Sequence, residues 1–168
     1  MKRLMTPPAF ALLLLLPSLL TAGLILDWSD PSEEPSEDEG TALVVRTYGR
    51  NETYVFVAGR VSNGSDYDFV ILAYDSEDGH VEWTATCDNG GDDQATALAL
   101  SPDGKRLYVT GMSQDTSGGG DDYDYVTVKY DAFGGDSLDG HRFDSQGGDD
   151  LPVDIETVSY THLRAHET

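Results

Sequence analysis

The sequence predicts an all-β fold made of four-stranded antiparallel meanders. The first observation is that residues 95–131 hold three short runs of β-type residues, which a Ser-Pro-Asp-Gly turn and a loop rich in Gly and Asp separate. The second is that the same pattern occurs earlier in the chain. Short runs of β-type residues that alternate with tight turns form antiparallel hairpins, so consecutive runs are expected to pair in chain order.

Two copies of one unit can be aligned. Three pairs of segments match at a nearly constant spacing, and these are 41–43 with 96–98 (TAL with TAL), 55–59 with 107–111 (VFVAG with LYVTG), and 66–75 with 122–131 (DYDFVILAYD with DYDYVTVKYD). A third copy begins at residues 147–150 (GGDD), which repeat residues 90–93. Self-similarity at about 50 residues with four short strands per unit is typical of propeller blades. We therefore predict about two blades of an incomplete β-propeller.

Each blade is expected to use four strands. The predicted strands are 41–48, 54–61, 67–74 and 81–87 in blade one (residues 41–87), and 96–100, 106–112, 123–130 and a weaker one near 137–144 in blade two (residues 95–144). Blade three is expected to start at residues 149–157. The first strand of a blade lies nearest the propeller axis, where small residues such as Ala97 and Ala99 fit the taper.

The residues of these motifs carry a family resemblance. Residues 91–111 (GDDQATALALSPDGKRLYVTG), the segment DYDYVTVKYD and the preceding Trp83 resemble the bacterial β-propeller repeat family often called SBBP. The resemblance covers residues 41–157 and implies a fold rather than a function. The sequence departs from the family pattern in two features. Gly140 stands where Trp83 stands in the first copy, and the opening turn of blade one, predicted over residues 48–53, is longer and lacks the Pro-Asp-Gly signal.

The N-terminal residues predict export. Residues 1–23 combine Lys2 and Arg3 with an apolar stretch and a small-residue end, which is typical of a cleaved secretory signal peptide. The alternative is an uncleaved anchor that extends through residues 24–26. Residues 24–40 are rich in acidic residues and proline, so a disordered linker is expected. The mature protein is expected to be secreted or on the cell surface, with no membrane insertion after cleavage.

The C-terminal segment needs a separate explanation. Residues 158–168 (VSYTHLRAHET) break the acidic, Gly-rich composition and resemble the translation of a sequencing adaptor. We therefore exclude His162 and His166 as a metal site and expect the natural protein to continue beyond Thr157.

Charge restricts the possible partners. Without residues 1–23 and 158–168 the 31 acidic residues become 30 and the 10 basic residues become 7, so the net charge falls from −21 to −23. Such a surface repels nucleic acid and anionic membranes. The remaining partners are cations, extracellular proteins with basic surfaces, or neutral glycans. The alternative is that the acidic residues only maintain solubility.

The single cysteine and the histidines do not indicate catalysis. Cys87 has no internal disulfide partner and is expected to be a small buried apolar residue of a strand. A cysteine nucleophile needs a histidine and an orienting acid, and no sequence pattern connects His80 or His141 to Cys87. No catalytic or cofactor-binding residue is assigned.

Acidic loops are the candidates for metal chemistry. Carboxylates, amide carbonyls and glycines supply the oxygen ligands and turns that Ca²⁺ prefers, although no EF-hand spacing is present. The candidate calcium ligands are Asp88, Asp92, Asp93, Asp121, Asp122, Asp149 and Asp150. The alternative is that Asp and Gly build tight turns. The recurrence of the Asp pair once per blade favours this structural role.

Three classes of function are compatible with the sequence. The first is a non-catalytic platform that binds a ligand or another protein. The second is part of a propeller enzyme, of the quinoprotein dehydrogenase or polysaccharide lyase type, whose catalytic residues lie in other blades. The third is a structural surface repeat. Fold alone does not choose among them. Two blades do not close a ring, so self-association through exposed blade edges or aggregation is expected.

Overall fold

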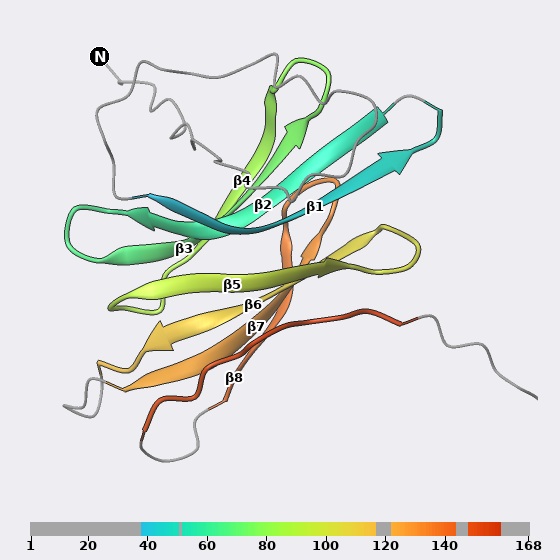
Figure 1. Ribbon diagram of the computed structural model, residues 1–168. Coiled ribbons are helices and arrows are strands. Elements are labelled where there is room, and N and C mark those ends of the chain that lie inside the picture. Colours follow the sequence, from blue (N-terminus) through green and yellow to red (C-terminus); the bar gives the residue numbers. More distant parts are fainter. Residues whose placement is uncertain (1–37, 51, 117–121, 144–147, 159–168) are drawn as a thin grey trace, which may run out of the picture.

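The computed structural model describes residues 38–50, 52–116, 122–143 and 148–158. These residues form two four-stranded antiparallel sheets and contain no helix, which confirms the predicted all-β fold of blade-like meanders. Strand order follows chain order in both sheets (Figure 1). The strands are β1 (Glu39–Tyr48), β2 (Glu52–Ser62), β3 (Tyr67–Asp75), β4 (Val81–Cys87), β5 (Asp93–Leu100), β6 (Arg106–Gln114), β7 (Tyr123–Asp131) and β8 (Ser137–Phe143).

The same turn chemistry closes the third hairpin of each sheet. After β3, the Asp75 carboxylate accepts the Glu77 N–H at 2.6 Å. After β7, the Asp131 carboxylate accepts the Phe133 N–H at 3.0 Å. In both turns a glycine with a positive φ, 74° in the first and 71° in the second, donates its N–H to the carbonyl of that aspartate. Residues with a Cβ rarely adopt this conformation. The matching segments of the sequence therefore mark one repeated structure.

The opening hairpins differ from each other. In the second sheet Ser101, Pro102, Asp103 and Gly104 lie in the turn, and the Asp103 carboxylate accepts the Lys105 N–H at 3.0 Å. In the first sheet only residues 49–51 separate β1 from β2. The prediction of a longer opening turn in blade one was wrong, because β2 begins at Glu52, which pairs with Tyr48.

A β-bulge near the start of each sheet fixes the register. It lies between Gly40 and Ala42 in β1 and between Ala95 and Ala97 in β5. Pairing continues past the bulge toward the N-terminus, so that β5 begins at Asp93 rather than at the predicted start, Thr96. A glycine lies across from each bulge, Gly59 in β2 and Gly111 in β6. A Cβ at either glycine would collide with main-chain atoms of the bulged strand.

The two sheets stack face to face, and their contact forms the main core (Figure 1). We call the face of a sheet that points toward the following part of the chain its forward face, and the opposite one its rear face. The forward face of the first sheet contributes Phe56, Ala58, Phe69, Ile71 and Ala73 to this core. The rear face of the second sheet contributes Leu107, Val109, Val126, Val128 and Tyr130. β5 crosses β1, β2 and β3 within this contact.

A second apolar cluster lies on the rear face of the first sheet. It contains Val57, Val70, Leu72 and Tyr74, with Val55 beside them. In the alignment of the two copies, these positions correspond to the rear-face residues of the second sheet. The repeat therefore provides each sheet with the same kind of rear face.

Several predictions lie outside the described residues. These are the signal peptide, residues 24–37 of the linker, and residues 159–168 of the adaptor-like tail. No helix long and apolar enough to span a membrane occurs within the residues that the structure describes.

Candidate functional site

The recurring Asp pair joins one repeat to the next. Asp92, which precedes β5, accepts the backbone N–H of Tyr67 at the start of β3, at 3.2 Å. Asp149 accepts the N–H of Tyr123 at the start of β7, at 3.1 Å. Both the acceptors and the donors occupy equivalent positions of the two copies. We call this contact the inter-repeat clasp, and it gives Asp92 and Asp149 a structural role.

Asp93 is the buried member of the first pair. It is 1 % exposed, and its Oδ2 accepts the Asn89 N–H at 2.7 Å, which holds the preceding loop. Its Oδ1 is buried without a hydrogen-bond partner, as is the hydroxyl of Ser113 in the strand opposite. Burial raises the pKa of Asp93, although the hydrogen bond from the Asn89 N–H favours its ionised form.

The other calcium candidates are spread over separate turns. Asp88 accepts the Gly90 N–H at 2.8 Å, the carbonyl of Asp122 accepts the Asp115 N–H, and Asp150 donates its N–H to the Tyr123 carbonyl. Asp121 lies outside the described residues. Within the described part of the chain, no three His, Cys, Asp or Glu side chains converge into a group that could hold a metal ion.

Cys87 lies at the end of β4 and is partly buried against the inter-sheet core. Burial raises the pKa of its thiol, and nearby Asp93, Asp88 and Asp68 act in the same direction. The protonated thiol is therefore favoured. This environment agrees with a packing role in the strand.

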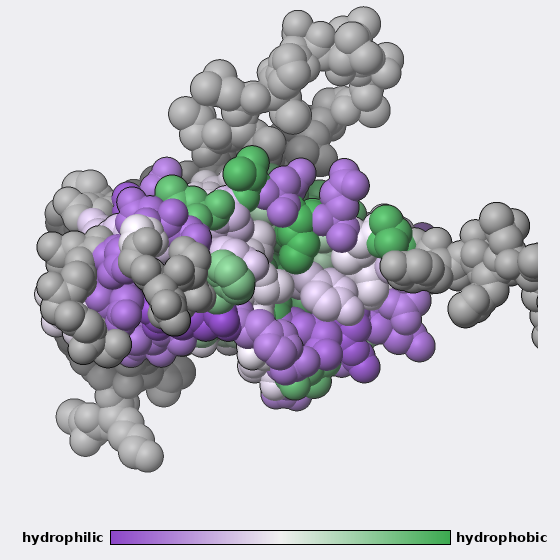
Figure 2. All heavy atoms as spheres, turned by 90° about the horizontal axis from the view of Figure 1, so that it is seen from below, coloured by the Kyte–Doolittle hydropathy of each residue, from purple (hydrophilic) through white to green (hydrophobic). Residues whose placement is uncertain are grey.

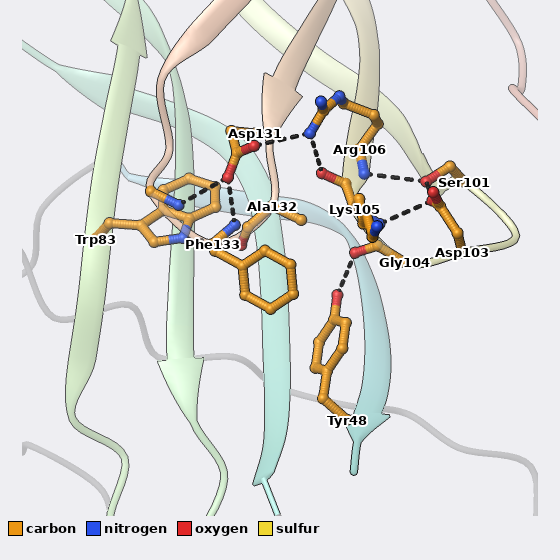
Figure 3. Close-up of polar contacts among 11 residues, drawn as sticks. Tyr48, Trp83, Ser101, Asp103, Gly104, Lys105, Arg106, Asp131, Ala132 and Phe133 are labelled. Carbon is orange, nitrogen blue, oxygen red and sulfur yellow. Dashed lines mark hydrogen bonds and ion pairs between the residues drawn. The ribbon is translucent and has the colours of Figure 1, made fainter.

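Two side chains of the first sheet reach turns of the second at one end of the stack (Figure 3). The Tyr48 hydroxyl donates to the Gly104 carbonyl at 2.5 Å, and the Trp83 indole N–H donates to the Ala132 carbonyl at 3.1 Å. Trp83 also covers Gly135, where a Cβ would lie 2.5 Å from the ring. These contacts give the tryptophan of the first copy a partner in the second sheet.

An ion pair that the sequence reasoning did not identify closes the other end of the second sheet. Asp124, in β7, is 2 % exposed, and Arg142 of β8 approaches its Oδ2 with two guanidinium nitrogens, each at 2.7 Å. In the first copy Asp68 replaces Asp124 and accepts a hydrogen bond from Asn63 at 3.0 Å. The acid recurs in the repeat but its partner changes, so the repeat pattern alone gave no signal for Arg142.

The forward face of the second sheet carries two hollows. Residues 148–158 pass across it, on the lower side in Figure 1. Beneath them lie two adjoining hollows of about 300 and 250 Å³, with Ile155 in the lining of both. Tyr108, Thr110, Tyr125 and Thr127 of the sheet contribute to these linings. Seen from this side, the molecule is mostly hydrophilic with separate hydrophobic residues (Figure 2).

The threonine hydroxyls on this face have partners within the sheet. Thr110 Oγ1 lies 3.1 Å from the Val126 carbonyl and 3.0 Å from Thr127 Oγ1, and the ammonium of Lys129 lies 3.5 Å from the Asp139 carboxylate. A further layer can therefore cover the face without leaving these groups unpaired.

Comparisons with known proteins add no family. No protein-family model matches the chain, and no curated protein matches it.

Proposed function

We propose that this chain is part of an exported β-propeller of the SBBP type, which acts as a non-catalytic platform for binding another protein. The observation that carries the proposal is the use of the acidic residues. Asp92 and Asp149 hold successive repeats together through main-chain hydrogen bonds, and Asp93 holds the loop before β5. These three carboxylates therefore support a repeated scaffold.

The open surface supports binding rather than turnover. The forward face of the second sheet combines two tyrosines, two threonines and two shallow hollows with the exposed apolar side chains of Leu151 and Val153. Aromatic side chains supply large contact areas with little loss of conformational freedom. Rigid scaffolds that present such surfaces through loops and edges are suited to recognition.

A screen with displayed peptides tests this function. The full chain is immobilised and screened against a random peptide library on phage, with a heat-unfolded sample of the same chain as the control. We expect enrichment of peptides that bind the folded chain only. Failure to enrich any such peptide would contradict a protein-binding platform.

Export is tested separately. When the full chain is expressed in a bacterium, we expect mature protein that begins near Leu24 in the periplasm or medium, because residues 1–23 fit a cleaved signal. Intact protein in the membrane pellet would support the uncleaved anchor instead.

A further inference from the structure

The chain contains two Asn-Gly dipeptides, Asn63-Gly64 and Asn89-Gly90. An asparagine before a glycine is prone to deamidation, because a glycine has no Cβ that keeps its main-chain nitrogen away from the asparagine side chain. Both asparagines are exposed and lie between strands. Both glycines have a positive φ, 94° at Gly64 and 81° at Gly90. The two sites are therefore equivalent in sequence, and their contacts distinguish them.

The side chain of Asn63 is held at both of its polar atoms. Its Oδ1 accepts the Ser65 N–H at 2.9 Å and the Asp66 N–H at 3.2 Å. Its Nδ2 donates to the carboxylates of Asp66 and Asp68, with a distance of 3.0 Å to Asp68. These hydrogen bonds must break before the amide carbon of Asn63 can approach the Gly64 nitrogen, so they oppose deamidation at this site.

The side chain of Asn89 is restrained more weakly. Its Nδ2 lies 3.5 Å from the sulfur of Cys87, and sulfur is a weak acceptor. The main chain of Asn89 is fixed, because the buried Asp93 carboxylate accepts its N–H at 2.7 Å. The Gly90 N–H donates to the Asp88 carboxylate at 2.8 Å. The proton that the Gly90 nitrogen loses on attack therefore already has a basic acceptor.

We propose that Asn89 is a site of spontaneous deamidation in the folded chain and that Asn63 is protected. The Gly90 nitrogen attacks the amide carbon of Asn89 and forms a C–N bond with it. The proton of the Gly90 N–H passes by way of the Asp88 carboxylate to the departing amide nitrogen, which leaves as ammonia. The product is a cyclic imide. Water then adds across one C–N bond of the ring and opens it to aspartate or isoaspartate at position 89.

The modification acts on the connection between the two sheets. Residues 88–92 join β4 of the first sheet to β5 of the second, and Asp92 makes the inter-repeat clasp with Tyr67. Isoaspartate routes the main chain through a side-chain carbon and so lengthens this connection. Either product also adds a carboxylate beside those of Asp88 and Asp93, and like charges at short range repel each other. The clasp should therefore open more often in the deamidated chain.

Mass spectrometry of the full chain after incubation in neutral buffer tests the proposal, with a protease that cuts between the two sites. In the folded chain we expect Asn89 to deamidate faster than Asn63 by about 10-fold or more, because the hydrogen bonds of Asn63 add to its barrier. In urea, where neither side chain is held, the two rates should be similar. Hydrogen exchange of the incubated folded chain should become faster at the Tyr67 amide, the donor of the clasp.

Variants at Asn63 test the protection. Asp66→Ala with Asp68→Ala removes both acceptors of the Asn63 Nδ2 and should raise the rate at Asn63 in the folded chain toward its rate in urea. Similar rates at the two asparagines of the folded wild-type chain would overturn the proposal, as would an unchanged rate at Asn63 in this variant.

Variants beside Asn89 test the role of the Asp88 carboxylate. Asp88→Ser removes the acceptor of the Gly90 proton and should slow deamidation at Asn89 by about 10-fold or more. Glu82→Ser removes the same charge from an exposed position of β4 and should leave the rate unchanged. A faster reaction in Asp88→Ser would show that this hydrogen bond shields the Gly90 nitrogen and would overturn the proposal.

Discussion

The forward faces of the two sheets differ although the sheets share their backbone plan. The first sheet presents Phe56, Ala58, Phe69, Ile71 and Ala73. The second sheet presents Tyr108, Thr110, Tyr125, Thr127 and Lys129 at the corresponding positions. Their rear faces, by contrast, are both rich in valine, leucine and a buried tyrosine. The repeat therefore keeps one face for stacking and changes the chemistry of the other.

This difference separates two kinds of contact. The apolar forward face of the first sheet is buried by the second sheet, and dry packing stabilises that contact. The polar forward face of the second sheet carries its own hydrogen bonds. Among the residues that the structure describes, residues 148–158 cover this face and leave hollows beneath them. Substitutions at corresponding positions should therefore have unequal effects.

The largest inequality is expected at one pair of corresponding positions, Ile71 and Thr127. Ile71 is 0 % exposed in the inter-sheet core, so Ile71→Ala should lower the free energy of unfolding by about 4 kcal/mol through lost burial and a cavity. Thr127→Ala removes one hydroxyl contact and should cost about 1 kcal/mol. Urea unfolding followed by tryptophan fluorescence measures both. Equal losses would show that the two forward faces contribute alike.

Gly111 and Gly59 provide the next comparison, at the two bulges. A Cβ on Gly111 would lie 2.2 Å from the Gln94 carbonyl oxygen and 2.5 Å from the Phe69 ring. Gly111→Ala should therefore cost about 3 kcal/mol. Gly59→Ala meets the Glu39 carbonyl at 1.8 Å, but Glu39 begins β1 and can move away, so the cost should be smaller. Thermal unfolding of both variants checks the order, and a larger loss for Gly59→Ala would contradict it.

The strands and turns could be predicted from the sequence because the patterns that specify them are local. Alternation along β7 and the Pro102-Asp103-Gly104 turn depend on neighbouring residues only, and the two-copy alignment transferred each assignment to the other sheet. The early start of β5 was missed because the Ala95/Ala97 bulge depends on the opposite strand. Bulges leave no periodic signal of their own in the sequence.

The candidate site was less predictable for a physical reason. Sequence identifies Asp92 and Asp149 as recurring carboxylates, but a carboxylate can bind either a cation or a backbone N–H. The structure is needed to show that the N–H groups of Tyr67 and Tyr123 lie beside these carboxylates and form the inter-repeat clasp with them.

Trp83 sharpens the comparison between the fourth strands. Trp83 pairs with Ala73 and Asp139 pairs with the equivalent residue Lys129, so the prediction that Gly140 takes the place of Trp83 was wrong, and Asp139 stands there in the second copy. Trp83→Phe removes the indole N–H that bonds the Ala132 carbonyl while keeping an aromatic ring over Gly135. Ala132 is 2 % exposed, so the substitution leaves its buried carbonyl without this hydrogen-bond donor. The free energy of unfolding should fall by about 1.5 kcal/mol. Chemical denaturation of this variant is followed by circular dichroism. A neutral effect would show that packing alone holds this end of the stack.

The two clasps should differ in what they hold. Asp92→Ala removes a contact between the two sheets and should lower the free energy of unfolding by about 1 kcal/mol. Asp149→Ala affects only the attachment of residues 148–158 to the second sheet, so global stability should change little. Hydrogen exchange should instead become faster within residues 150–157. Unchanged exchange in Asp149→Ala would indicate that the hydrogen bonds from the Asp150 N–H to the Tyr123 carbonyl and from the Thr157 hydroxyl to the Leu100 carbonyl suffice.

The smallest effect is expected at Asp93, and it depends on pH. Because burial raises the pKa of Asp93, the folded protein binds this proton more tightly than the unfolded chain does. The stability that the bound proton provides is complete below the ordinary pKa of 3.8. It is lost as the pH rises from that value through the raised pKa of the folded protein, and stability stays lower at neutral pH.

Asp93→Asn should remove this pH dependence, because the amide keeps an oxygen to accept the Asn89 N–H and adds a donor that can reach Ser113. The variant should unfold at a slightly higher urea concentration than the wild type at neutral pH, and at the same concentration in acid below the ordinary pKa. Glu82→Gln, an exposed control in β4, should show no such difference between the two conditions. A destabilised Asp93→Asn at neutral pH would mean that the loop before β5 requires the ionised carboxylate.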